Sequence, residues 1–283
     1  MILIFGRTGQ VATELARQAD VMALGRGEAD LMQPGAAEAV IAAQKPEVVI
    51  NASAWTAVDR AEAEEAAAHR LNADAPAEMA QSCAQRGIPF LHVSTDYVFD
   101  GTGAAPWRET DPAAPRNAYG RTKLAGEDAV RKVTEQSGGN ALILRTSWVF
   151  SAHGANFVKT MLRLARSRDH LTVVADQIGG PTPADAIAAT LLGCARAMMD
   201  GQRGGTYHYA GAPATSWAGF AREIMAQAGQ GVTVEDIPTS AYPTPAERPL
   251  NSRLDCARLA ADFGIEQPAW QAGLARVLKE LGA

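Results

Sequence analysis

Residues 1–12 read MILIFGRTGQVA, a short apolar run followed at once by Gly6, Gly9 and Ala12. The apolar run predicts a buried strand, and the spaced small residues predict a tight turn into a helix. Gly6 permits the turn, Gly9 lets the backbone approach an anion at the helix N-terminus, and Ala12 permits close packing of helix on strand. This order of elements is typical of dinucleotide binding, although the spacing GxxGxxA departs from GxGxxG.

The first half of the chain alternates apolar runs with helical patterns. Strands are expected near residues 1–5, 21–24, 46–52, 89–94 and 142–149. Helices are expected from Glu62 to Arg86, with Asn72 as a polar interruption, and from Asp255 to Phe263, with Gly264 at the helix end. Such alternation predicts an α/β fold, a Rossmann-type doubly wound parallel sheet covered on both faces. After residue 149 the alternation loosens, which predicts a smaller α/β substrate-binding lobe. We therefore expect a dinucleotide-binding domain at 1–150 with a returning segment near 183–210, and a substrate-binding lobe that occupies most of 151–283, interleaved with it.

Composition narrows the functional classes. The 283 residues carry a net charge of −5 and no long basic run, which argues against a nucleic-acid partner. No apolar run approaches the ~20 residues of a membrane span, so no membrane partner is expected. No signal peptide is recognisable, and the three cysteines are far apart and odd in number, which fits a reducing, cytoplasmic location.

Several segments are expected beside the cofactor. Arg26 follows the second strand, where an acidic residue would favour NAD and a cation can meet the 2′-phosphate of NADP. This favours NADPH. The tip of the third strand should also lie at the cofactor, since ligands bind at the carboxyl ends of parallel strands. The expected cofactor contacts are Gly6, Thr8, Gly9, Gln10, Val11, Arg26, Asp30, Leu31, Ala52, Ser53, Ala54 and Lys123.

The chemistry is expected between Ser94 and Lys123. A strand ends in Ser94-Thr95-Asp96, and Tyr119 and Lys123 stand four residues apart, on one face of a helix. An amine near a phenol favours the phenolate, so Tyr119 could deliver a proton to a developing alkoxide while Thr95 orients the carbonyl. The Gly- and Pro-rich segment 100–117 should cover this site. The five histidines form no spaced ligand set, and we expect them to be structural.

These motifs together resemble the extended short-chain dehydrogenase/reductase superfamily, and within it the dTDP-4-dehydrorhamnose reductase family. The matching stretches are GRTGQV at 6–11, STDYVFDG at 94–101, YGRTKLAGE at 119–127, RTSWV at 145–149 and YPTPAERPLNSRL at 242–254. The resemblance implies reduction of the 4-keto group of dTDP-4-dehydro-L-rhamnose, a dTDP-linked 4-keto-6-deoxysugar, to give dTDP-L-rhamnose for cell-wall polysaccharide. It also implies NADPH as the cofactor, with NADH possible.

The resemblance assigns roles to individual residues. Tyr119 would be the proton donor, Lys123 its partner and a ribose ligand, and Thr95 the third catalytic group. Asp96, Tyr97 and Trp148 would line the sugar pocket, while Arg248 and Asn251 belong to a Pro- and Arg-rich loop that should face the anionic substrate. Some relatives hold Mg²⁺ with acids across a dimer. The comparable residues here are Glu14, Asp185 and Glu280, in a protein expected to be a monomer or homodimer.

Two other readings stay open. An epimerase or dehydratase of the same fold would retain NAD⁺, but a dehydratase would place a carboxylate where this chain has Tyr97. A non-catalytic subunit resembling the regulatory subunit of methionine adenosyltransferase would not need the complete Thr95, Tyr119 and Lys123 set.

Overall fold

The computed structural model describes all 283 residues. Its helices are α1 Gln10–Gln18, α2 Ala36–Gln44, α3 Val58–Ala63, α4 Glu65–His69, α5 Ala75–Gln85, α6 Ala118–Ser137, α7 Phe157–Ala165, α8 Ala184–Met199, α9 Trp217–Gln227, α10 Ala257–Phe263 and α11 Trp270–Leu281. Its strands are β1 Ile2–Phe5, β2 Val21–Leu24, β3 Val48–Asn51, β4 Phe90–Thr95, β5 Ala141–Thr146, β6 Val149–Phe150, β7 His170–Val174, β8 Ile178–Gly179, β9 Thr182–Pro183, β10 Thr206–His208, β11 Thr215–Ser216, β12 Thr233–Ile237 and β13 Asn251–Ser252.

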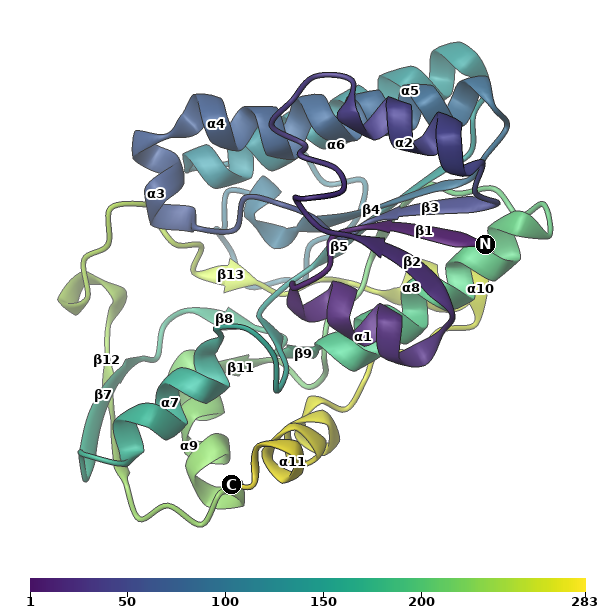
Figure 1. The fold of residues 1–283 in the computed structure, drawn as a ribbon. Coiled ribbons are helices and arrows are strands. Elements are labelled where there is room, and N and C mark those ends of the chain that lie inside the picture. Colours follow the sequence, from purple (N-terminus) through teal and green to yellow (C-terminus); the bar gives the residue numbers. More distant parts are fainter.

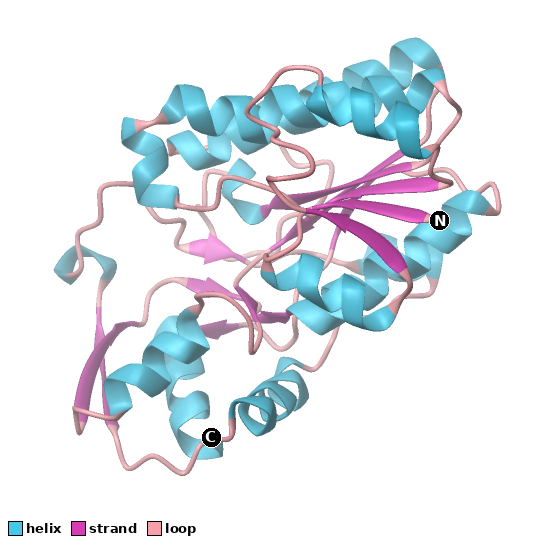
Figure 2. Ribbon diagram, viewed as in Figure 1, coloured by secondary structure: helices cyan, strands magenta, loops and turns pink.

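A six-stranded parallel sheet forms the larger part of the molecule, in the order β10-β5-β4-β3-β1-β2. Helices α2, α5 and α6 cover one face, and α1 and α8 cover the other (Figures 1 and 2). The strand order reverses beside β1, as it does in doubly wound sheets. The fold class expected from the sequence is therefore confirmed.

Each face of the sheet has its own apolar core. Ile4, Ile50 and Leu144 point toward α1 and α8, while Leu3, Phe5 and Val49 point toward α2 and α5. Because successive side chains of a strand point to opposite faces, continuous apolar runs such as LIF and VVI fill both cores. Helix α8 and strand β10 join this sheet although they follow residue 180 in the chain.

The remaining segments build a smaller lobe below the sheet in Figure 1. It contains the parallel pair β7–β12, the short sheet β11-β8-β13 and the helices α7, α9 and α11. A third apolar core, with Phe150, Phe220 and Trp270 among its members, holds these helices together. No helix of the chain is both long enough and apolar enough to cross a membrane.

The stretch after β3 differs from the sequence expectation. Helices were expected from Glu62 to Arg86, but the first begins at Val58, and residues 70–74 form a π-helical turn. Asn72, the expected polar interruption, lies in this turn and binds the backbone of Trp55 through both its oxygen (2.8 Å) and its nitrogen (3.2 Å). Helix α6 crosses here so closely that a Cβ at Gly126 would collide with the carbonyl oxygen of Asn72.

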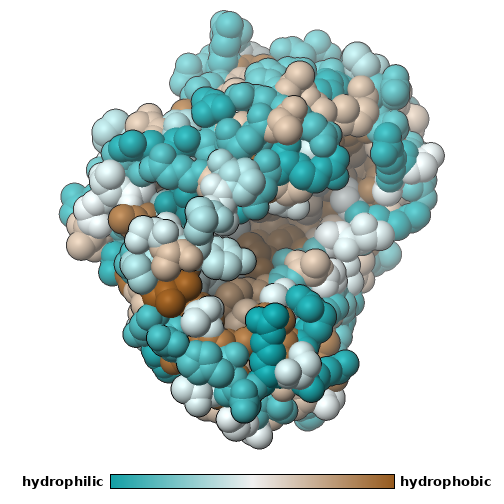
Figure 3. Space-filling view, turned by 90° about the vertical axis from the view of Figure 1, so that its left-hand side faces the viewer, coloured by the Kyte–Doolittle hydropathy of each residue, from teal (hydrophilic) through white to brown (hydrophobic).

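The carboxyl ends of the sheet strands face one side of the molecule. That side is hollowed between the two lobes, and apolar residues lie at the floor of the hollow (Figure 3). Residues 100–117 contain no helix or strand, and they run between β4 and α6 with a single bridge from Trp107 to Leu254. Ligands of open parallel sheets bind at this edge, so the functional residues are sought there.

Candidate functional site

The turn after β1 is built for a close approach of another group. Gly6 has φ +121°, and a Cβ there would lie 3.2 Å from the carbonyl oxygen of Ala52. Gly9 precedes α1 in an extended conformation, and no side chain caps this helix end. The first N–H groups of α1 are therefore free to bind an anion such as a pyrophosphate. A dinucleotide fits this arrangement.

The neighbouring side chains of the turn have separate tasks. Val11 is buried in the core, so only its backbone can face a ligand, whereas Thr8 is exposed. The Gln10 amide ties α1 to the second half of the chain, because its oxygen accepts from Ser151 (2.8 Å) and Asn156 (2.9 Å). At the tip of β3, the Ser53 hydroxyl and N–H both donate to Asn51 Oδ1, which leaves Ala52 and Ala54 flanking the glycine turn.

Cations gather at the end of β2. The Arg26 side chain is 80% exposed and lies 3.4 Å from Asp30, while Leu31 is buried beneath them. Arg7 packs against the position of Gly25 and pairs with Glu28 at 2.5 Å. From the sequence, a 2′-phosphate contact was expected of Arg26 alone. Arg7, an unremarked residue of the glycine turn, supplies a second guanidinium at the same place.

The proposed proton-transfer groups come together where β4 ends and α6 begins. Thr95 is 5% exposed, and its hydroxyl lies 3.1 Å from Asp96 Oδ1 and accepts the N–H of Tyr97 at 3.2 Å. Burial raises the pKa of the Tyr119 phenol to about 12, while a hydrogen bond with Thr95 acts in the opposite direction. Tyr97 meets Tyr119 edge to face at 5.5 Å. Tyr119 is therefore a protonated phenol at neutral pH, held between Thr95 and an aromatic neighbour.

Lys123 differs from expectation in its contacts. Its ammonium group is 1% exposed and donates to the carbonyl of Val93 at 2.7 Å. It also lies 3.2 Å from Nε2 of His92 rather than forming a hydrogen bond with Tyr119. Burial lowers the pKa of Lys123 to about 8. The expectation that all five histidines are merely structural did not anticipate the contact of His92 with Lys123.

A buried ion pair supports this corner from behind. Glu127 is fully buried and accepts two hydrogen bonds from Arg145, at 2.9 and 2.6 Å, and one from the Ser94 hydroxyl at 2.5 Å. Burial alone would raise the pKa of Glu127, but these donors hold it below its usual value. Ser94 precedes Thr95, and Glu127 follows Lys123 by one turn, so the Ser94 hydrogen bond fixes β4 against α6 while the ion pair fixes α6 against β5.

The proposed sugar pocket is aromatic on one side and polar on the other. Trp148 has φ +48°, stacks on Trp217 at 3.6 Å, and leaves no room for a Cβ at Gly179. Three buried oxygens, namely Asp96 Oδ2, Thr146 Oγ1 and Ser252 Oγ, have no well-formed hydrogen bond, although Ser252 lies close enough to Asp96 to act on its pKa. Unpaired buried oxygens of this kind are open to the hydroxyls of a ligand. Trp217 and Ser252 were given no role from the sequence: Trp217 lies in no motif, and Ser252 lies in the stretch 242–254 next to Asn251.

The two residues from the Pro- and Arg-rich loop are already engaged within the protein. Arg248 pairs with Asp59 at 2.8 Å. The Asn251 amide donates to Ala105 and Thr102, and its oxygen accepts from Arg253. Asn251 therefore clamps segment 100–117 onto β13, and its expected contact with substrate stays a prediction.

Asp96 gives the site a pH-dependent stability. Burial raises its pKa from 3.8 to about 6, so the folded protein binds this proton more tightly than the unfolded chain. The free energy of unfolding should therefore fall as the pH rises from about 4 to about 6. Urea denaturation should show Asp96→Asn to be more stable than wild type at pH 7 by about 2 kcal/mol, and less so at pH 4. An equal difference at both pH values would contradict this, and Asp200→Asn, on an exposed carboxylate, is the control.

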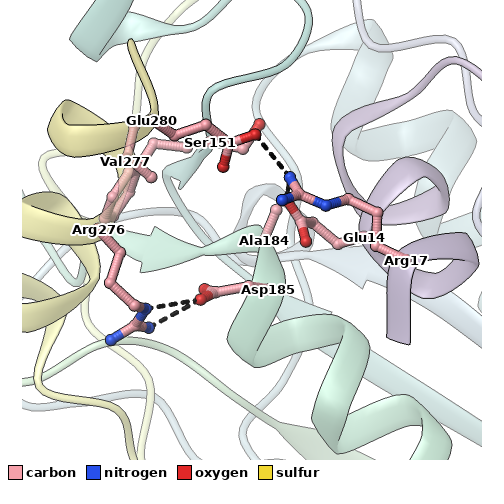
Figure 4. Close-up of a pocket in the computed structure, with 9 residues that line it drawn as sticks. Glu14, Arg17, Ser151, Ala184, Asp185, Arg276, Val277 and Glu280 are labelled. Carbon is pink, nitrogen blue, oxygen red and sulfur yellow. Dashed lines mark hydrogen bonds and ion pairs between the residues drawn. The ribbon is translucent and has the colours of Figure 1, made fainter. Parts of the chain in front are cut away.

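The candidate metal residues do not form a single ligand set. Glu14, His153 and Glu280 lie within 4.8 Å of one another, but Arg17 donates to Glu280 at 2.7 Å and lies 3.4 Å from Glu14. Asp185 stands apart and pairs with Arg276 at 2.8 Å (Figure 4). Mg²⁺ needs oxygen ligands in octahedral geometry, and guanidinium groups already balance these acids. The Mg²⁺ that the resemblance raised for these acids does not fit this arrangement.

A parallel sheet with a glycine turn, a free helix N-terminus and a Thr, Tyr and Lys set defines a dinucleotide-binding enzyme of the short-chain dehydrogenase/reductase type. The family model described as RmlD substrate binding domain matches residues 1–283. The chain belongs to this family. The resemblance recognised in the sequence is thereby confirmed.

Known relatives match nearly end to end. A dTDP-4-dehydrorhamnose reductase of Burkholderia thailandensis is 46% identical, over 99% of this chain and 98% of its own length. A dTDP-4-dehydrorhamnose reductase structure from Clostridium acetobutylicum has a TM-score of 0.92 at 34% identity and covers 100% of this chain and 99% of its own. That from Bacillus anthracis, in complex with NADP, has a TM-score of 0.91 at 32% identity, covering 99% and 98%.

Proposed function

We propose that this protein reduces the 4-keto group of dTDP-4-dehydro-L-rhamnose with NADPH, giving dTDP-L-rhamnose. The observation that carries the proposal is the end-to-end similarity to dTDP-4-dehydrorhamnose reductases, combined with an intact Thr95, Tyr119 and Lys123 set. The three buried free cysteines support a place in the reducing cytoplasm.

The residues of this chain have defined roles in such a reduction. The NADPH supplies the hydride, and the glycine turn with the N-terminus of α1 would hold its pyrophosphate. Tyr119 carries the proton that the developing alkoxide takes up, because its pKa of about 12 keeps the phenol protonated. Thr95, beside it, donates to the same oxygen and fixes the direction of the carbonyl.

The substrate would lie between the two lobes. We assign the cofactor to residues 1–150 with the returning segment 183–210, and the sugar mainly to residues 151–283. Asp96, with its unpaired Oδ2, would accept a sugar hydroxyl, while Tyr97 and Trp148 would pack against the ring. Arg248 would turn from Asp59 toward the diphosphate.

The proposal is tested by mixing purified protein with NADPH and authentic dTDP-4-dehydro-L-rhamnose. The absorbance at 340 nm should fall as NADPH is oxidised. Mass spectrometry and chromatography should identify dTDP-L-rhamnose as the product. No oxidation by well-folded, NADPH-binding protein would overturn it. An epimerase of this fold would instead retain NAD⁺ through purification, so the cofactor content of the protein separates the two readings.

The cofactor preference gives a second test. Arg26→Ala should raise the KM for NADPH roughly 10-fold, because hydrogen bonds to charged groups contribute about 1.5–3 kcal/mol. The KM for NADH should hardly change, since NADH lacks the 2′-phosphate. Arg168→Ala, on an exposed cation of the smaller lobe, is the matched control. An equal rise in the KM for NADPH and for NADH would show that Arg26 does not recognise the 2′-phosphate. Arg7 would then be the cation to test.

A further inference from the structure

A buried polar chain leads from Lys123 into the sheet and has no part in the mechanism above. Lys123 Nζ lies 3.2 Å from His92 Nε2, and His92 Nδ1 lies 3.1 Å from Asn51 Nδ2. Asn51 Oδ1 then accepts from Ser53. Lys123, His92 and Asn51 are each at most 1% exposed, so no water replaces these contacts.

The orientation of the Asn51 amide is fixed by its neighbour. The backbone N–H of Ser53, which can only donate, lies 3.0 Å from Asn51 Oδ1. The amide NH₂ must therefore point at His92 and donate to Nδ1. Burial and the nearby Lys123 hold the pKa of His92 well below its usual value, so the ring is neutral. A neutral imidazole whose Nδ1 accepts carries its proton on Nε2.

This tautomer of His92 determines which protonation form of Lys123 can form a hydrogen bond with it. An Nε2–H donor faces Lys123 Nζ, and an ammonium group has no lone pair to accept it. Only the neutral amine completes the hydrogen bond, while the Val93 carbonyl accepts from either form. One other charged group faces Lys123, the carboxylate of Glu127 on the same helix, and it is held by Arg145, Arg131 and Ser94.

We propose that His92 is a positioning residue: Asn51 holds its proton on Nε2, and this N–H stabilises Lys123 as a neutral amine and so sets the pH at which the ammonium one helical turn from Tyr119 loses its charge. The proposal rests on the reductase function. Tyr119 gives its proton to the alkoxide and becomes a phenolate. Solvent returns a proton to the phenolate, since Tyr119 is partly exposed, so each turnover consumes one proton, and the charge on Lys123 lowers the cost of forming the phenolate.

The tautomer can be measured without any variant. Long-range ¹H–¹⁵N correlation spectra of ¹⁵N-histidine-labelled protein should show His92 as a neutral Nε2–H imidazole from pH 6 to 9. The chain has only five histidines and five lysines, so single signals can be assigned. The ¹³Cε signal of Lys123 should titrate near pH 8. An Nδ1–H tautomer at His92 would overturn the proposal.

Two variants test the consequence for turnover. In Asn51→Asp, a carboxylate accepts from Nδ1 and frees the Nε2 lone pair for the ammonium. In His92→Gln, the side-chain amide oxygen can accept a hydrogen bond from the Lys123 ammonium. Both should raise the Lys123 titration midpoint by about one pH unit or more, and move the alkaline fall of kcat upward with it. His170→Gln, on an exposed imidazole of β7, is the control.

The outcomes separate the possible roles. A merely structural His92 would lower kcat at every pH and leave the alkaline limb in place, which overturns the proposal. If neither variant folds, the tautomer of His92 and the titration midpoint of Lys123 in the wild-type protein still test the proposal. If the wild-type protein fails to oxidise NADPH with the ketosugar, the proposed function fails, while the spectra report on His92 independently.

Discussion

Tyr119→Phe should lower kcat/KM for the ketosugar roughly 10²–10⁴-fold, the usual contribution of a positioned acid. The Tyr119 phenol is protonated at neutral pH and lies beside Thr95, so its removal takes away the proton source assigned to the alkoxide. Binding of NADPH should hardly change, because the glycine turn and α1 are untouched. Stopped-flow measurement of hydride transfer, with fluorescence titration of NADPH, separates chemistry from binding.

Tyr207→Phe is the matched control, since it removes the same oxygen at a distance from the site. The Tyr207 hydroxyl donates to Asp262 at 2.9 Å, and its loss should cost about 1 kcal/mol of stability and no activity. Tyr119→Phe with activity within a few-fold of wild type would show that another group supplies the proton. Asp96, buried beside Thr95, would then be the next acid to test.

The parts of the fold that could be predicted are those with a local cause. Strands β1 to β5 were expected within a few residues, because each is an apolar run bounded by turn residues. The left-handed Gly264 after α10 was likewise expected at a helix end. The start of α3 at Val58 was missed, because its first turn is polar and lies in the expected tip of β3.

The parts of the site that could not be predicted depend on contacts between distant segments. Lys123 meets His92 because α6 crosses the carboxyl end of β4, and no spacing in the sequence encodes that crossing. Trp217 reaches Trp148 only through the docking of α9 in the smaller lobe. The contacts of Asn251 also depend on a distant segment, because its hydrogen-bond partners lie about 150 residues earlier. Only the folded chain shows that its amide already donates within the protein.

Glu127→Ala should destabilise the protein by about 3–5 kcal/mol, the usual cost of breaking a buried ion pair from one side. The change leaves the Arg145 guanidinium buried without its carboxylate and the Ser94 hydroxyl without its acceptor. The nearby His208 offers only a neutral ring, because burial lowers its pKa to about 4, and the ring of Phe99 at 5.0 Å is only a weak substitute for a carboxylate. Urea denaturation at pH 7 measures the loss.

The double variant Glu127→Leu with Arg145→Met distinguishes a missing charge from a missing volume. Without either ion, the site needs no compensating charge, so most of the lost stability should return. Glu135→Ala, on an exposed carboxylate of α6, should cost less than about 0.5 kcal/mol. If the double variant is as unstable as Glu127→Ala, packing of β4 against α6 rather than charge pairing sets the stability. Ser94 would then fix the position of Thr95 through the strand alone.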